Sequence, residues 1–411
     1  MHAFPKNPLE LKTYLIDPLY RNTFFIIITS LSSAGFGFLF WMLAARFYPQ
    51  EDVGIATALI SSMGMLILLS KLGFDQSIIR FFPTRDKSRV LGTAITVTTL
   101  FGLVLGVLFI VTVDIWSPEL HQIKDYAPLY IIFLIANSVT AFIGAAFVAL
   151  RKAELYFLQS LLFGSRLLIL VPLVFLGALG IFCSLGLSFI IALIVSVFLL
   201  YRSGIRFSSL DREFLTDSFR FSAGNYVSGL LIAAPGTLLP ILVLNILGAE
   251  QAAQYFIAYA VVMFLFLIPT SFTTSLFVEG SHGGALKRNV LKSLAGIFAL
   301  LIPAVVGLFV FGEYILGLIG PDYVAGLELV KVLAISSFFF SFSEVFIAIK
   351  KVQDGLKSLI VISAIIFILL LGSSYVLMLQ FGILGVGYAW ILTYALIGIV
   401  VVLSMVRRYA P

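Results

Sequence analysis

The chain has 411 residues, of which 61% are hydrophobic and only 11% are charged, and its formal net charge is +6 at pH 7. Soluble globular proteins carry about 25% charged residues, so this composition excludes a cytosolic enzyme, a disordered protein and a coiled coil. The long apolar runs do not alternate with polar residues, which also excludes an outer-membrane barrel. The sequence therefore predicts an all-α polytopic membrane protein.

Twelve apolar runs approach or exceed the length of about 20 residues that a helix needs to cross a bilayer. In chain order, the predicted spans are 23–45, 53–72, 90–113, 127–149, 158–179, 181–201, 223–247, 253–276, 294–311, 327–348, 358–379 and 386–406. Only Gly177 and Gly180 separate the fifth span from the sixth. Residues 158–201 are too long for one helix, so we expect a tight hairpin of two.

The basic residues alternate with these spans. The segments that share a side with both termini are 1–22, 73–89, 150–157, 202–222, 277–293, 349–357 and 407–411. They hold most of the 26 Lys and Arg residues, whereas the opposite loops hold only Lys124, with Arg46 at a helix end. Because cytoplasmic loops are rich in Lys and Arg, we expect both termini in the cytoplasm and the protein in the cell membrane. The net positive charge then reflects membrane topology and attraction to anionic lipids. We expect no nucleic-acid partner.

The two halves of the chain resemble each other at one constant sequence separation. The matching pairs are Tyr20-Arg21 with Phe219-Arg220, Glu51 with Glu250, and Arg151-Lys152 with Lys350-Lys351. We therefore predict a parallel internal repeat, with a six-helix lobe in residues 1–210, a second in 211–411, and a central cavity between them. The regular spacing of hairpins in any twelve-span protein is the alternative explanation.

Three segments carry a resemblance to a known family. They are Ala44–Gly54 (AARFYPQEDVG), Lys71–Pro83 (KLGFDQSIIRFFP) and Phe311–Tyr323 (FGEYILGLIGPDY). Here the sequence resembles the polysaccharide-unit flippases of the multidrug/oligosaccharidyl-lipid/polysaccharide exporter superfamily, and the likeness extends along most of the chain. The resemblance implies a V-shaped pair of six-helix bundles. They would move a polyprenyl-linked oligosaccharide or polysaccharide repeat unit from the inner to the outer leaflet by alternating access, with no enzymatic step.

A flippase of this kind must pass a polar sugar–pyrophosphate head through hydrocarbon. Its cavity needs a few cations for phosphate, and hydroxyl, amide or aromatic groups for sugars. The expected partners are the lipid-linked glycan, membrane lipids and glycan-assembly proteins, with a monomer favoured. We expect no cofactor and no metal site, because Cys183 is the only cysteine and His2, His121 and His282 are far apart in the sequence.

Arg166 is the most informative residue within the spans. It lies eight residues beyond Leu158, which is about 12 Å along a helix. A charge at such depth costs at least about 2.5 kcal/mol on insertion scales, so it should face a cavity or a partner. We expect a contact with the phosphate or sugar of the substrate. An ion pair or a clamp on carbonyl groups between helices is the structural alternative.

Two further arginines are candidate substrate contacts at the mouths of the cavity. Arg80 follows span 2 and is positioned to receive the pyrophosphate from the inner leaflet, or it anchors the chain at the cytoplasmic interface. Arg46 ends span 1 and is a candidate for the matching contact at the outer mouth, or it is an interfacial helix end.

Four residues of spans 7 and 8 are candidates for binding sugar. Asn225 and Tyr226 open span 7, which faces the centre in the architecture that the resemblance implies. Tyr255 and Tyr259 are four residues apart and share one face of span 8. Aromatic rings stack on sugars, but in membrane proteins they more often pack in the core or form interfacial belts.

Glu344 is the acid that lies clearly inside a predicted span, since Glu328 is at an outer edge. This position makes Glu344 the best candidate for a proton or sodium site, with Asp75 weaker. A solvated carboxylate at a helix end is the alternative for both.

Proline residues are expected to kink several spans. Pro235 and Pro240 bracket Gly236 in span 7, so this stretch is the candidate hinge between inward-facing and outward-facing states. A static kink explains the same residues.

Other functions remain open from the sequence. A cation-coupled multidrug exporter of the same superfamily is the first alternative, although predicted spans 1, 2, 7 and 8 contain no Asp or Glu. A membrane glycan polymerase or glycosyltransferase is less favoured, because the predicted outer loops are short. A sugar or amino-acid porter of another twelve-span fold is a further alternative. The glycan and the energy source (proton, sodium or membrane potential) are not determined by the sequence.

Overall fold

The computed structural model describes residues 18–206, 208, 210–281, 286–353 and 355–409. Across these residues the chain is helical, with no strand. Eleven of the described helices are long and apolar enough to cross a membrane, and α16 (Leu384–Tyr409) adds the shorter apolar stretch Leu384–Ile399. The predicted all-α, multi-pass membrane protein of about twelve spans is confirmed.

The chain divides into two compact units. Unit 1 comprises residues 1–47 and 63–223, and unit 2 comprises residues 48–62 and 224–411. Two helices are shared between the units, namely α3 (Gln50–Ser70) and α11 (Arg212–Leu247). The repeat with lobes 1–210 and 211–411 stays a prediction; the compact units differ from those lobes in residues 48–62 and 211–223.

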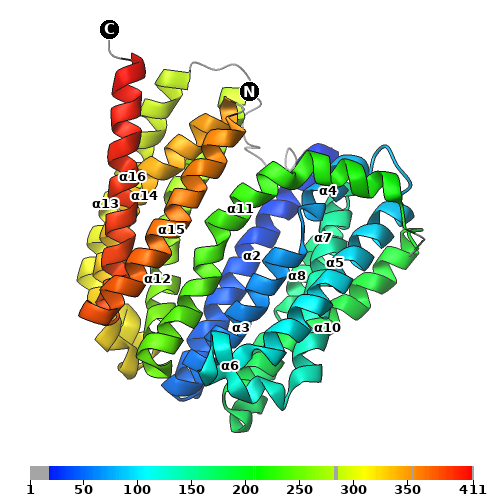
Figure 1. The fold of residues 1–411 in the computed structure, drawn as a ribbon, viewed down its shortest axis with the longest axis horizontal. Helices are drawn as coiled ribbons and strands as arrows, with labels where there is room; N and C mark the ends of the chain where they lie inside the picture. Colours follow the sequence, from blue (N-terminus) through cyan, green and yellow to red (C-terminus); the bar gives the residue numbers. More distant parts are fainter. Residues whose placement is uncertain (1–17, 207, 209, 282–285, 354, 410–411) are drawn as a thin grey trace, which may run out of the picture. The chain divides into compact units, whose positions relative to one another are not determined.

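Unit 1 is built around α7 (Ala127–Ala149), which packs against α4, α5, α8 and α10 (Figure 1). Its other elements are α2 (Pro18–Phe47), α4 (Phe74–Phe81), α5 (Lys87–Val111), α6 (Val113–Trp116), η1 (Pro118–Lys124), α8 (Ala153–Phe163), α9 (Arg166–Leu170), η2 (Val171–Leu176) and α10 (Ala178–Arg202). The hydrophobic core of this unit consists of aromatic and aliphatic side chains. Phe142 and Phe147 of α7 are fully buried there in one cluster with Phe74, Val90 and Phe214.

Unit 2 is built around α14 (Leu327–Val352), which packs on α12 (Ala249–Ser281), α13 (Leu286–Ile319) and α16 (Figure 1). The remaining elements are η3 (Pro321–Gly326) and α15 (Leu356–Phe381), and α15 pairs with α16. Close backbone approach joins α3 to this unit. A Cβ at Gly54 would overlap the carbonyl group of Ala249, so only glycine fits where the first turn of α3 meets α12.

The fifth and sixth spans form the expected hairpin, with a turn at Gly177, whose φ is 57°. The fifth span is one span, Ala153–Leu176, but it is not one regular α-helix. α8 ends at Phe163, Gly164 and Ser165 form a turn, α9 follows, and Pro172 lies in the 3-10 helix η2. Gly-Ser pairs and proline are the usual sites of helix breaks, and here both occur within one span.

The seventh span begins earlier than predicted. α11 starts at Arg212, whereas the apolar run starts at residue 223. Asp211 initiates this helix, because its Oδ1 accepts a hydrogen bond from the backbone N–H of Phe214 at 2.9 Å. Phe214, Ser218 and Ser222 are buried at intervals of four residues, so a polar segment forms a helix through one packed face.

The segment between α5 and α7 is a short helical turn held by polar contacts. Asp114 accepts hydrogen bonds from Lys124 and, at 2.6 Å, from His121. These two partners, with Lys124 the stronger, hold the pKa of the Asp114 carboxyl below its ordinary value. Val113, Leu120 and Ile123 of this segment are buried, whereas the side chains of Asp114 and His121 are exposed.

Candidate functional site

Arg166 lies at the break in the fifth span, as the first residue of α9. From Ala153 at the start of α8, the chain rises about 20 Å to Arg166 at 1.5 Å per residue. From Arg166 to the turn at Gly177 it rises a further distance of about 20 Å through α9 and η2. The structure thus places this cation near the middle of the span, where a helix is interrupted.

The Arg166 side chain lies against α2. Its guanidinium carbon is 5.2 Å from the centre of the Phe40 ring, a cation–π geometry. Its Nη2 lies 3.7 Å from the point that a Cβ at Gly37 would occupy. A small residue on α2 therefore leaves room for the guanidinium.

No carboxylate of the described residues lies within ion-pair distance of Arg166, and its Nε is buried without a hydrogen-bond partner. A structural salt bridge, one of the alternatives for this residue, is not present in the part of the chain that the structure describes. A partly buried cation within a membrane span is costly without a counter-charge. Arg166 is therefore suited to bind an anion that enters the site.

Small polar residues accompany Arg166 on both helices. The Ser33 and Ser160 hydroxyl groups are 2.8 Å apart and join α2 to α8. The Ser165 Oγ, at the break itself, is buried and has no hydrogen-bond partner. By contrast, Thr29 and Ser30 donate to carbonyl groups of their own helix, Phe25 O and Ile26 O, so those hydroxyl groups are already satisfied.

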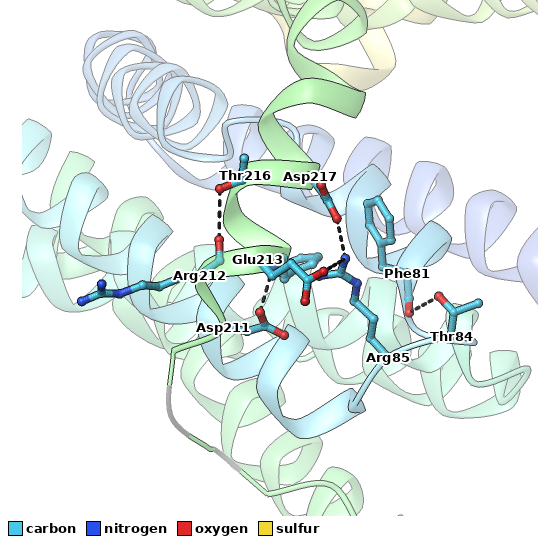
Figure 2. Close-up of polar contacts among 9 residues, drawn as sticks. Phe81, Thr84, Arg85, Asp211, Arg212, Glu213, Thr216 and Asp217 are labelled. Carbon is cyan, nitrogen blue, oxygen red and sulfur yellow. Dashed lines mark hydrogen bonds and ion pairs between the residues drawn. The ribbon is translucent and has the colours of Figure 1, made fainter.

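Arg80 lies at the end of unit 1 that contains α4 and the first turns of α11. Its guanidinium carbon is 4.5 Å from the centre of the Phe221 ring, and both side chains are exposed. Nearby, Arg85 pairs with Asp217 and lies 3.8 Å from Glu213. Figure 2 shows Arg85 directed at these two carboxylates while Arg212 points away from them. The start of α11 is thus held to the rest of unit 1 by charge as well as by packing.

Aromatic contacts support the same attachment. Phe81 of α4 lies 5.9 Å from Phe214 and 6.0 Å from Phe221, measured between ring centres. The Arg85 guanidinium carbon lies 5.2 Å from the Phe81 ring (Figure 2). Arg80 and Arg166 are therefore separate sites in unit 1, one beside the start of α11 and one in the fifth span.

Tyr255 and Tyr259 share a face of α12 as predicted, with stacked rings whose centres are 6.1 Å apart. They belong to a buried aromatic cluster of unit 2. Tyr259 lies 5.6 Å from Trp390, which lies 5.5 Å from Tyr394. Tyr255 is only 1% exposed. Tyr259 is partly buried, and sugar stacking by the pair stays a prediction.

Glu344 lies on α14 and is partly buried. Its carboxylate interacts electrostatically with Lys351 on the same helix and with Tyr394 of α16. Among the described residues it has neither an ion pair nor a hydrogen bond within contact distance. In contrast, Glu328 pairs with Lys331 at 2.7 Å. Glu344, the acid predicted to lie inside a span, thus lacks the close ion pair that Glu328 forms at the helix end, among the residues that the structure describes.

The remaining candidates occupy helix ends and one long helix. Arg46 is exposed in the last turn of α2, and Asp75 in α4 accepts a hydrogen bond from the backbone of Gln76 at 2.9 Å. Asn225 is exposed and Tyr226 partly buried in α11. α11 continues as one helix through Pro235, Gly236 and Pro240, so the hinge at these residues stays a prediction.

Relatives of the chain are found in sequence and in fold. The family described as "Polysaccharide biosynthesis protein" matches residues 19–277. The chain belongs to this family. No curated protein matches the sequence.

Solved transporters share the fold of this polysaccharide biosynthesis family member. A multidrug resistance MATE family transporter of the MOP superfamily, in its inward-facing conformation, has a TM-score of 0.72 at 13% identity, over 92% of this chain and 96% of that one. The lipid II flippase MurJ, in its inward closed conformation, has a TM-score of 0.70 at 15% identity, over 93% and 87%. An outward-facing MATE structure has a TM-score of 0.61 at 14% identity, over 95% of both chains. At these identities the likeness establishes the fold.

Several residues around Arg166 in this family member were not predicted from the sequence. Phe40 and Gly37 were missed because nothing in the sequence pairs span 1 with span 5. Ser165 could have been found, because it follows Gly164 and precedes a mid-span arginine. The signal is a Gly-Ser pair beside a charge at the depth where a continuous apolar helix is expected.

Proposed function

We propose that this protein moves a polyprenyl-linked oligosaccharide or polysaccharide repeat unit from the inner to the outer leaflet of the cell membrane by alternating access. Both termini lie in the cytoplasm, as the distribution of Lys and Arg suggests. The polysaccharide biosynthesis family supports a glycan substrate, and the shared transporter fold supports movement across a membrane.

The observation that carries the proposal is the uncompensated Arg166 at the helix break in the fifth span. A lipid-linked glycan has an anionic pyrophosphate and a hydroxyl-rich head. Arg166 supplies a planar guanidinium suited to phosphate oxygens, and Ser165 supplies an unused hydroxyl. Interrupted helices are common at the substrate sites of transporters, and the fifth span is irregular at Gly164 and Ser165, directly before Arg166.

In this mechanism the phosphate neutralises Arg166 during transport. Water or carbonyl groups satisfy the guanidinium when the site is empty. Arg80, stacked on Phe221, makes an earlier contact with the pyrophosphate on the cytoplasmic side, and Arg46 makes a later one at the outer mouth. Asn225 and Tyr226 contribute polar contacts to the sugar, and no residue forms a covalent bond with the substrate.

Glu344 is the candidate for coupling transport to an ion gradient, with Asp75 second. Its support is its position on α14, which packs against α16, where it is partly buried and forms no close ion pair with another described residue. A proton or a sodium ion would neutralise the carboxylate in one conformation and be released in the other. The stretch with Pro235, Gly236 and Pro240 is the proposed site of bending in α11.

Reconstitution in liposomes tests the function directly. The purified protein should accelerate transbilayer movement of a fluorescent polyprenyl-pyrophosphate oligosaccharide, measured by quenching from outside, without changing the length of the glycan. Gradient-driven export of a cationic dye without movement of the glycan lipid would instead identify a multidrug exporter. Elongation or transfer of the glycan would identify an enzyme.

A further inference from the structure

α10 carries an exposed apolar stripe along unit 1. Its members recur every three or four residues, which places them on one face of the helix. They are Leu187, Ile191, Ile194, Phe198 and Tyr201, between 37% and 64% exposed. In a span of this hydropathy, such a face contacts the acyl chains of the bilayer.

Two arginines lie over the end of this stripe. The Arg202 guanidinium carbon is 5.0 Å from the centre of the Phe198 ring, and that of Arg206 is 5.6 Å from the Tyr201 ring. Both arginines are exposed, and so are both rings. The Phe198 and Tyr201 rings therefore hold the guanidinium groups of Arg202 and Arg206 at the end of the apolar stripe.

The start of α5 adds further cations to the same corner. The backbone N–H of Arg206 donates to Ser88 Oγ at 3.2 Å, and the Ser208 carbonyl oxygen lies 2.7 Å from where a Cβ at Gly92 would be. Arg206 and Ser208 thus lie against the first turns of α5. Lys87 and Arg89, both exposed, flank Ser88 in these turns.

Two nearby carboxylates already accept hydrogen bonds from backbone N–H groups at helix starts. Asp86 Oδ1 accepts from the backbone of Arg89 at 2.8 Å and caps α5, and Asp211 caps α11. Among the described residues, no carboxylate forms an ion pair with Arg202, Arg206 or Lys87. The corner therefore presents uncompensated positive charge directly beside a lipid-facing apolar surface.

We propose that this corner is a binding site for an anionic phospholipid of the cytoplasmic leaflet. The phosphate binds between Arg202 and Arg206, and an acyl chain follows Ile194 and Phe198. A membrane lipid fits better than a soluble anion, because the rings that hold the two arginines are continuous with the apolar stripe. This site is separate from Arg166 and does not depend on the identity of the transported substrate.

Lipid titration of the purified protein tests the proposal. Native mass spectrometry in detergent should show phosphatidylglycerol binding in preference to phosphatidylcholine. The double variant Arg202→Gln/Arg206→Gln should bind phosphatidylglycerol about 25-fold more weakly, since each basic residue at a membrane surface contributes roughly a fivefold gain. The matched control Lys287→Gln/Lys292→Gln on α13 removes the same charge from exposed residues of unit 2 and should change binding by less than about threefold.

Two further arms keep the result decisive if the glutamine variant does not fold. Phe198→Leu/Tyr201→Leu retains all charges and should still weaken phosphatidylglycerol binding, because the arginines lose their ring contacts. Inorganic phosphate at millimolar concentration should not displace the lipid. Equal losses in the α13 control, unchanged binding in the ring variant, or displacement by phosphate would each overturn the proposal.

Discussion

The Arg166 guanidinium carbon lies 5.2 Å from the centre of the Phe40 ring, which joins the broken fifth span to the first. The ring contacts one face of the guanidinium and attracts the cation without neutralising its charge. The edge of the guanidinium, with its N–H groups, remains the part that can bind an anion. This geometry keeps the arginine within the span while leaving it able to bind phosphate.

The predicted topology can be tested by cysteine labelling. In a background where the buried Cys183 is replaced, single cysteines at His121 and at Asp322, beside Gly320, should react with an impermeant reagent from outside. Cysteines at Lys87, Arg212, Lys287 and Gln353 should react only from the cytoplasm. Labelling of the Asp322 position from the cytoplasmic side would contradict the orientation.

Gly54→Ala should destabilise unit 2. The added Cβ would meet the Ala249 carbonyl group, and overpacking of this kind costs about 1–3 kcal/mol, so the melting temperature in detergent should fall. Gly236→Ala is the matched control, since no atom lies within 4 Å of its added Cβ, and it should melt at or above the wild-type temperature. If Gly236 is part of a hinge, its variant will be stable yet slower in transport.

Arg85→Ala should loosen the first turns of α11. The variant loses the pairing with Asp217 and the contact with Glu213, a change worth about 1 kcal/mol for partly exposed partners. Hydrogen exchange across residues 212–223 should therefore accelerate roughly fivefold. Arg212→Ala, whose side chain points away from this cluster (Figure 2), should leave the exchange unchanged. Equal acceleration in both variants would show that the ion pairs do not hold the helix.

Glu344→Gln should uncouple transport from the ion gradient. The neutral side chain cannot exchange a proton or hold sodium, so the ratio of initial rates with and without a gradient should fall toward one in proteoliposomes. Glu328→Gln removes an exposed acid that pairs with Lys331 and should keep the gradient dependence. An unchanged ratio in the Glu344 variant would assign coupling to another group.

The sequence predicted features that depend on local pattern. The twelve spans follow from length and hydropathy, and the hairpin between the fifth and sixth was predicted from Gly177, which adopts the positive φ expected of glycine. The early start of α11 was missed, because hydropathy identifies only the apolar part of a helix. Phe214 and Ser218 are buried within unit 1, and the tertiary contact makes this polar segment helical.

The candidate site was predicted only in part, for the same reason. The cost of a mid-span charge identified Arg166 from the sequence alone. Its neighbours Phe40 and Gly37 come from a helix more than 100 residues earlier in the chain, so no local pattern connects them. Tyr255 and Tyr259 show the opposite case, in which the spacing predicted their shared face and the structure placed that face in an aromatic core.

The most direct test of the account is glycan-lipid movement per folded molecule in Arg166→Ala and Arg166→Lys, measured in proteoliposomes with Lys331→Met as the control for loss of a span-end cation. We predict that Arg166→Ala folds and abolishes movement, that Arg166→Lys retains part of it because the charge remains without the bidentate fork, and that Lys331→Met is unaffected. Normal movement per folded molecule of Arg166→Ala, with a loss only in the amount of folded protein, would contradict the role of Arg166 as the phosphate contact.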